Sequence, residues 1–197
     1  MPVVKHQHKP SLRLTKDTAF IGFDLGKTTS AGIVKIQDGV PVVIDALSTD
    51  LGYDEPPKGK LKHDARLARR IDRLWVFMEN IMDVYPDYVI GVEHPAQMRG
   101  KIAIGDLQSY FGVALLMARR SGKRFETFQV SEWKSKIGAN VSFGSHTKQK
   151  VRQKETKQRI LDVILELTGV DYGKNHDKAD SIGIAIATAI MKGGLVI

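Results

Sequence analysis

The chain of 197 residues contains no cysteine. This absence excludes disulfides and a thiolate zinc site, and it fits a protein kept in a reducing cytosol. The sequence also lacks long apolar runs, since none approaches the roughly 18 residues that a membrane-spanning helix needs. The N-terminus has no apolar core of a secretion signal. We therefore expect a cytoplasmic protein with no membrane partner.

Negative charge is in the minority. The chain has 22 Asp and Glu residues against 30 Lys and Arg, a formal net charge of +8. Such an excess favours a polyanionic partner, chiefly nucleic acid, although solubility alone could account for a milder one. The length suits one domain with a proper core. We predict a flexible basic tail over residues 1–18 and a single domain over residues 19–197.

The hydrophobic pattern predicts a mixed α/β fold. Three strand signals come first and are separated by turn residues, which indicates an antiparallel start. Helical and strand patterns then alternate, as expected of a layered α/β domain. The predicted strands are 19–25, 29–37, 40–48, 88–93 and 123–130, and the predicted helices are 61–84, 102–121, 131–137, 147–168 and 176–191.

Four acidic residues stand out by their positions. Asp24 ends the first strand, Glu93 ends the fourth, and Asp177 and Asp180 share one face at the start of the last helix. An ionised carboxylate in a core is costly unless a cation or donors compensate it. Mg²⁺ prefers oxygen ligands, so the cluster is a candidate two-metal site for phosphoryl chemistry.

Simpler interpretations exist for three of these residues. Asp177 can interact with the helix dipole and the unpaired amides of the first turn. Asp24 can form an Asx-type turn, and Glu93 can be an ordinary charge at a strand end. Asp180 lies deeper in an apolar helix and has no comparable structural role. We therefore favour a joint role for all four.

The same residues carry a resemblance to a known family. The motifs are Phe23-Asp24-Leu25-Gly26 with Ser30-Ala31-Gly32, then Tyr88 to Glu93, and last Asp177 to Ala187. Their order and spacing resemble the RuvC family of Holliday-junction resolvases, within the ribonuclease H-like superfamily, over about residues 19–192. The resemblance implies a ribonuclease H-like fold, with a five-stranded mixed sheet flanked by helices.

The resemblance also implies an activity. Family members are homodimeric crossover-junction endonucleases that bind four-way DNA and nick two strands of like polarity, leaving 5′-phosphate and 3′-hydroxyl ends. Asp24, Glu93, Asp177 and Asp180 fall on the family's metal-binding positions, which implies two Mg²⁺ ions per site, with Mn²⁺ as a substitute. The expected compartment is the cytoplasm of a bacterium or of a phage-infected host.

Basic residues fit this implied site. Lys134 follows the fifth strand, where family members carry a catalytic or DNA-contacting lysine. Lys154 is the best match to the family's second, catalytic lysine, with Lys148 and Lys150 as rivals. A basic helix front would neutralise several phosphates, although a solvated helix face is the simpler interpretation. The predicted DNA-binding residues are Lys134, Lys148, Lys150, Arg152, Lys154 and Lys157.

The sequence departs from the family pattern in two places. Bacterial relatives often have an aromatic wedge after the catalytic Glu, whereas here His94 to Arg99 has none and Met98 is at best a weak substitute. The segment 136–153 is longer than expected and includes a Gly/Ser-rich loop. Both departures suggest a phage or otherwise divergent member, and they leave strict junction selectivity open.

Three alternatives remain. Asp24 to Ser30 resembles the first phosphate hairpin of sugar kinases and actin-like ATPases, but this chain has no second Asp-Gly-rich motif and about half their length. It is also no Walker A loop, because Ile21 stands where that motif needs glycine. A non-catalytic binding module is disfavoured, since clustered acids without metal would repel DNA. A related nuclease acting on flaps or RNA would carry the same site.

Overall fold

A computed structural model of the chain describes residues 14–52, 62–95 and 101–196, with the side chains of 101–104 outside that description. Its elements follow the predicted order closely. The strands are β1 (Ala19–Asp24), β2 (Thr28–Gln37), β3 (Val40–Asp50), β4 (Tyr88–Glu93) and β5 (Arg124–Phe128). The helices are α1 (His63–Val84), α2 (Lys101–Ser121), α3 (Val130–Lys136), α4 (Gln149–Thr168) and α5 (His176–Met191).

The strands form one mixed sheet in the order β3-β2-β1-β4-β5. β1, β2 and β3 pair antiparallel, whereas β4 runs parallel to β1 and β5 runs parallel to β4. This arrangement confirms the predicted fold class. Parallel pairing sets the C-terminal ends of β1 and β4 at the same edge of the sheet, and both strands end in a carboxylate there.

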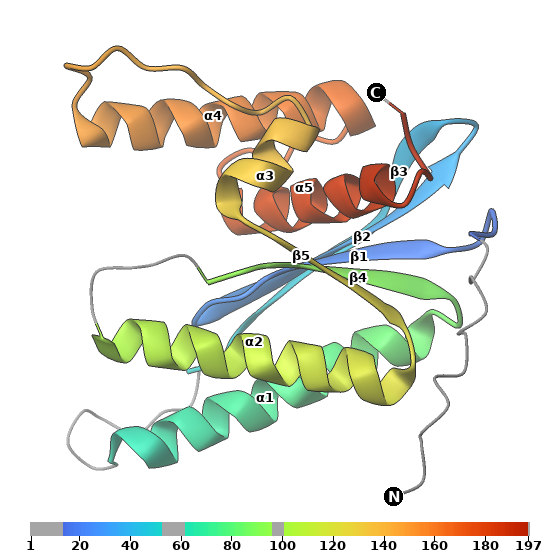
Figure 1. The fold of residues 1–197 in the computed structure, drawn as a ribbon, viewed down its shortest axis with the longest axis vertical. Coiled ribbons are helices and arrows are strands. Elements are labelled where there is room, and N and C mark those ends of the chain that lie inside the picture. The colour runs from blue at the N-terminus through green and yellow to red at the C-terminus, as the bar shows by residue number, and fades with distance from the viewer. Residues whose placement is uncertain (1–13, 53–61, 96–100, 197) are drawn as a thin grey trace, which may run out of the picture.

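Helices cover both faces of the sheet (Figure 1). α1 and α2 pack on one face, where Ile21 and Val92 belong to the core, and α3, α4 and α5 lie over the other, where Phe20 and Val89 do. The alternation follows from the two-residue repeat of a strand. Residues of β1 with even numbers therefore face α5, and Asp24 is one of them.

Three glycines in neighbouring strands let α5 lie unusually close to the sheet. Gly32 pairs with Gly22, and Gly22 pairs with Gly91, so they form a row across β2, β1 and β4. A Cβ at Gly32 would lie 2.5 Å from the Ile182 nitrogen, and one at Gly22 would overlap the α5 backbone at Ser181. Close approach of two backbones is a typical reason for glycine inside a strand.

The predicted tail is shorter than expected at its C-terminal end. We predicted flexibility through residue 18, but Leu14 packs against the core and Thr18 is buried. The Thr18 hydroxyl donates a hydrogen bond to the Asp87 carboxylate, which fixes the chain before β1. Residues 14–18 therefore join the domain that we predicted to begin at residue 19, while residues 1–13 lie outside the described residues.

The fifth strand ends at Phe128, two residues before its predicted end, because α3 begins at Val130 after a capping box formed by Gln129 and Glu132.

No helix in the described part of the chain has the length and apolar character needed to cross a membrane.

Candidate active site

The sheet register places Asp24 and Glu93 next to each other. Phe23 pairs with Val92, and one further step along the parallel strands brings Asp24 beside Glu93. Both side chains belong to the face covered by α5, because they share parity with Gly22 and Gly91, whose Cα atoms face that helix. Two of the four predicted ligands are thus adjacent through strand pairing alone.

Helix α5 carries the other two carboxylates to this edge. The Asn175 side chain caps the helix by accepting a hydrogen bond from the Lys178 amide at 3.2 Å. Asp177 is exposed in the first turn, and Asp180 is half-buried one turn further on. The cap and the glycine row together fix where these two acids stand relative to the sheet.

The four carboxylates act on one another electrostatically. The pKa of Asp24 lies well above its ordinary value, mainly because of burial and then because of the charges of Asp180, Glu93 and Asp177. Burial likewise raises the pKa of Asp180 to about 6; the Lys134 charge opposes this, and the Glu93 and Asp177 charges add to it. The fold therefore brings all four predicted acids into one local field.

A buried tryptophan orients Glu93. The Trp133 indole Nε1–H donates to Glu93 Oε2 at 2.7 Å, and the ring is fully buried. Burial raises the pKa of Glu93, while this hydrogen bond and the Lys134 charge lower it. The ring rests on Gly183 of α5, where a Cβ would lie 2.7 Å from it. Sequence reasoning missed Trp133, and its place directly before Lys134 was the only local signal.

One buried hydroxyl beside Asp24 has no partner. Ser30 pairs with Asp24 across β1 and β2, and its side chain is fully buried. Its Oγ makes no hydrogen bond to the protein. An unsatisfied buried polar group costs about 1–3 kcal/mol, so such groups are uncommon away from functional sites. Ser30 is part of the first motif, but no sequence pattern indicated that its hydroxyl would lie buried beside Asp24 without a partner.

The acids interact electrostatically, but their side chains are not arranged as the ligands of a bound ion. Among the described residues, no group of three or more His, Cys, Asp or Glu side chains has the arrangement of a bound ion's ligands. The predicted metal role of Asp24, Glu93, Asp177 and Asp180 therefore stays a prediction. Burial raises the pKa values of Asp24, Glu93 and Asp180, and neighbouring carboxylates add to this at Asp24 and Asp180.

Two lysines act on these acids directly. Lys134 lowers the pKa values of Asp24, Glu93 and Asp180, and Lys157 lowers that of Asp180. Lys134, Lys157 and Asp180 also line one hollow of about 400 Å³ between α3, α4 and α5, which we call the central hollow. Its other lining residues are Arg152, Gln153, Thr156 and Ile160.

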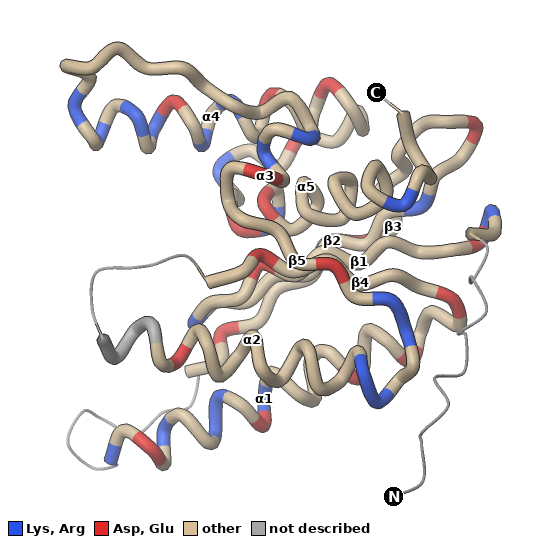
Figure 2. Tube along the Cα trace, in the orientation of Figure 1, with Lys and Arg blue, Asp and Glu red and all other residues tan. Residues whose placement is uncertain are grey.

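The other predicted lysines lie further along α4. Lys150 and Lys154 line a neighbouring hollow with Lys157, and Lys148 is exposed at the N-cap of the helix. Figure 2 shows Lys and Arg gathered along the front of α4. The structure thus places Lys134 and Lys157 at the acids, and the catalytic role assigned to Lys154 stays a prediction.

Arg152 has a structural role that the sequence did not reveal. Its Nε donates to the Thr147 carbonyl at 2.9 Å, and its Nη2 donates to the Gly144 carbonyl at 2.9 Å and to the Ser145 carbonyl. Its guanidinium also lies over the Phe143 ring at 5.8 Å. These contacts hold the loop before α4 in place, so most of the donors of this predicted DNA-binding residue are already used.

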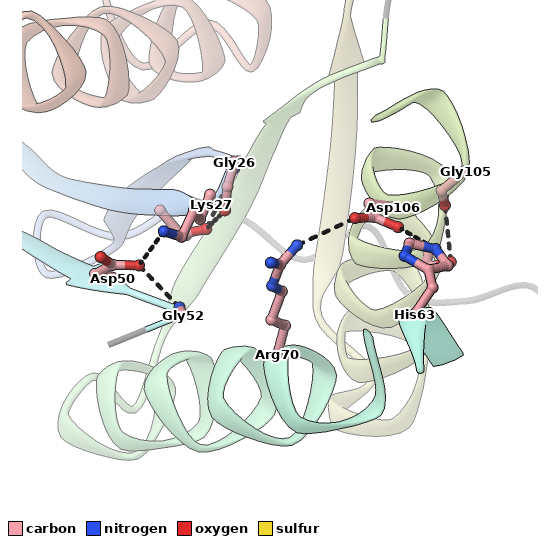
Figure 3. Close-up of polar contacts among 10 residues, drawn as sticks. Gly26, Lys27, Asp50, Gly52, His63, Arg70, Gly105 and Asp106 are labelled. Carbon is pink, nitrogen blue, oxygen red and sulfur yellow. Dashed lines mark hydrogen bonds and ion pairs between the residues drawn. The ribbon is translucent and has the colours of Figure 1, made fainter. Parts of the chain in front are cut away.

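On the opposite face, charges pair with each other. Arg70 of α1 and Asp106 of α2 form an ion pair at 3.2 Å, and His63 Nε2 also approaches Asp106 at 3.2 Å (Figure 3). At the nearby hairpin, Lys27 lies 4.0 Å from Asp50. Met98, considered as a wedge, lies outside the described residues.

The strand order, the antiparallel and parallel pairings and the helices on both faces define a ribonuclease H-like fold. By sequence, the chain matches no protein-family model and no curated protein. Solved structures do match it, and two come from RuvC of Thermus thermophilus. RuvC in complex with a Holliday junction substrate aligns with a TM-score of 0.66 and 12% identity, covering 90% of this chain and 95% of that one.

A second RuvC structure from Thermus thermophilus gives a TM-score of 0.64 at 14% identity, covering 89% of this chain and 96% of that one. The yeast mitochondrial Holliday junction resolvase Ydc2 gives 0.50 at 16% identity, covering 91% of this chain and 80% of that one. The likeness to RuvC-like resolvases that the motifs predicted is therefore confirmed, as a likeness of fold across nearly the whole chain.

Proposed function

We propose that this protein is a Mg²⁺-dependent, structure-selective DNA endonuclease that resolves four-way junctions by paired phosphodiester cleavage. The observation that carries the proposal is the convergence of four acids: burial, and then the charges of Asp180, Glu93 and Asp177, raise the pKa of Asp24. A basic helix borders them, and the fold is shared with RuvC and Ydc2. Cleavage is inferred to leave 5′-phosphate and 3′-hydroxyl ends.

The residues at this edge fit Mg²⁺, with Mn²⁺ as a substitute. All four acids offer oxygen donors, and burial and the neighbouring acids raise the pKa of Asp24 despite the opposing Lys134 charge, so a bound cation would stabilise its carboxylate. The unpartnered Ser30 hydroxyl can bond a water that such an ion retains. Asp24, Glu93, Asp177 and Asp180 would hold two ions. When bound, the ions supply an activated water and stabilise the leaving 3′-oxygen.

The protein's own contribution is placement and charge. The Trp133 indole fixes the orientation of the Glu93 carboxylate through its hydrogen bond of 2.7 Å. Lys134 and Lys157 stand in the central hollow with Asp180 and would attract the strand whose phosphate is cleaved. Holding the phosphate beside oriented carboxylates supplies the positioning on which phosphoryl transfer depends.

A homodimer is part of the proposal, because paired nicks need two sites. Helix α2 offers an exposed apolar surface for it: Leu115 is 47% exposed and Leu116 is 50% exposed. Contiguous exposed leucines on an otherwise amphipathic helix favour self-association.

Light scattering after gel filtration should give twice the chain mass for the parent, and Leu116→Glu should reduce the measured mass to that of one chain. A parent that is monomeric at working concentration would remove the dimer from the account.

The function is tested with labelled four-way junction, linear duplex, flap DNA and RNA, each with Mg²⁺ and with chelator. We expect symmetric paired nicks in the junction, no cleavage in chelator and little cleavage of duplex. Equal cleavage of flaps or of RNA would establish the broader nuclease instead. ATP hydrolysis without DNA cleavage would overturn the proposal in favour of the kinase-like alternative.

A further inference from the structure

Two more hollows adjoin the central one and continue it across the same face. One hollow of about 470 Å³ is lined by Lys150, Lys154, Lys157, Lys174 and His176, and we call it the lysine hollow. The other, of about 380 Å³, includes Gln129, Ser131, Lys134 and Asn140, and we call it the polar hollow.

Shared residues join the three hollows into one track. Lys157 and Gln153 line both the lysine hollow and the central hollow. Lys134 and Thr156 line both the central hollow and the polar hollow. The central hollow, which contains Asp180, thus has one neighbouring hollow at Lys157 and another at Lys134. A row of hollows of this form suits an extended chain better than a compact ligand.

The two ends of the track differ in charge. The lysine hollow has four lysines and no acid among its lining residues. The polar hollow has one lysine, and the rest of its polar lining is neutral. Clustered ammonium groups bind phosphates as point charges, whereas amides and hydroxyls suit base edges and sugars. The lysine hollow therefore suits a backbone phosphate.

Lys174 and His176 enter the site from a firmly held turn. Gly173 has a φ of +57° and donates its amide to Asp171 Oδ1 at 2.7 Å. The Asn175 amide donates to the Tyr172 carbonyl at 2.9 Å. Because the turn runs straight into α5, it sets Lys174 at a fixed place relative to Asp177. Neither Lys174 nor His176 was among the residues that the sequence motifs singled out.

We propose that the lysine hollow binds a backbone phosphate adjacent to the cleaved one, and that a single DNA strand runs from it over Asp180 to the polar hollow. This inference rests on the proposed nuclease function, and it adds Lys174 and His176 as DNA contacts. It also assigns Lys154 to binding of that adjacent phosphate, because Lys154 lines the lysine hollow together with Lys157.

The test is methylphosphonate scanning of a four-way junction, in which one phosphate at a time near the centre is made neutral. Affinity is measured by fluorescence anisotropy in chelator, where metal-dependent cleavage stops. For the parent, we expect one position beside the cleaved phosphate to weaken binding several-fold. In Lys174→Gln the loss at that position should become smaller, because one of the four lysines of the hollow is gone, while neutralising other positions should weaken binding as in the parent. The salt slope of Lys174→Gln should also fall by about 0.7–0.9.

Lys35→Gln is the matched control, because Lys35 lies near the far end of β2 from Ser30. It should keep the parental salt slope and scanning profile. If Lys174→Gln keeps both as well while the parent cleaves junctions, the lysine hollow holds no phosphate and the proposed function stands. If the parent neither binds nor cleaves the junction, the proposed function itself fails.

Discussion

The two faces of the sheet use charge in opposite ways. Between α1 and α2, Arg70 and Asp106 neutralise each other at 3.2 Å. On the α5 face, Asp24 and Asp180 carry raised pKa values, and no ion pair among the described residues joins either of them to Lys134. Other charges on that face do pair, Lys192 with Glu126 and Arg159 with Glu166, but the acids of the site and Lys134 remain apart. The α1–α2 face thus pairs Arg70 with Asp106, whereas the site on the α5 face keeps its acids available for a ligand.

The largest effect should follow from removing one acid of the α5 face. Asp180→Asn should reduce junction cleavage by roughly a thousandfold or more, since this carboxylate is proposed to hold a metal ion at the reacting phosphate. Junction binding should stay at the parental level or tighten, because a negative charge is lost beside DNA. Asp83→Asn, an exposed acid on α1, is the control and should cleave normally. Loss of binding in Asp180→Asn would instead give this acid a structural role.

Close packing of α5 can be tested with a pair of glycines. Gly22→Ala should destabilise the fold by about 3 kcal/mol, because the added Cβ meets the backbone of α5. Gly112→Ala on α2 has open space at its Cβ, so it should be neutral or stabilising by up to about 1 kcal/mol. Urea unfolding measures the change in the free energy of unfolding for both variants, provided that the dependence on urea concentration has the same slope as in the parent. Equal stability of the two variants would contradict the glycine row.

A further comparison separates Lys134 from the rest of the basic surface. Lys134→Gln should lower cleavage about 100-fold, at the low end of the usual range for a group that stabilises developing charge. Since Lys134 lowers the pKa values of Asp24, Glu93 and Asp180, its loss should move the acidic limb of the rate–pH profile upward. Lys136→Gln, on the same helix, should leave that limb in place. A uniform rate loss at every pH would assign Lys134 to DNA binding alone.

Removing one acid should change stability in opposite directions on the two faces. The pKa of Asp180 rises from 3.8 to about 6 on folding. The contribution of this carboxyl to the stability of the fold is therefore full below about pH 4 and is lost as pH rises through 6. At pH 7 without metal, Asp180→Asn should therefore stabilise the fold by on the order of 2 kcal/mol, or roughly 5 °C. Asp106→Asn should instead lower the melting temperature, because its ion pair with Arg70 is lost.

Calorimetry from pH 4 to pH 8 in chelator decides this pair. The gap between Asp180→Asn and the parent should close near pH 4, where the parental carboxyl is already protonated. A gap that stays constant with pH would mean that the Asp180→Asn substitution acts through packing and not through charge.

Much of this molecule was predictable because the signals were local. Strand alternation and turn residues indicated the strands, and strand pairing then set Asp24 beside Glu93. The roles of Ser30, a motif residue, and of Trp133 were not predictable, since they depend on register and on how α3 packs against α5. Arg152 was misleading for the same reason: a basic residue in a basic run donates to three carbonyls of a loop whose path no sequence pattern describes.

Metal binding by the carboxylates of the α5 face underlies the whole proposed function. Mn²⁺ titration followed by electron paramagnetic resonance at pH 7 counts bound ions on the intact chain directly. We predict two Mn²⁺ per chain, displaced by Mg²⁺, with binding severely weakened in Asp24→Asn and unchanged in Asp106→Asn. A parent that binds no Mn²⁺ at millimolar concentration, or an Asp24→Asn variant that binds two ions as the parent does, would contradict the account.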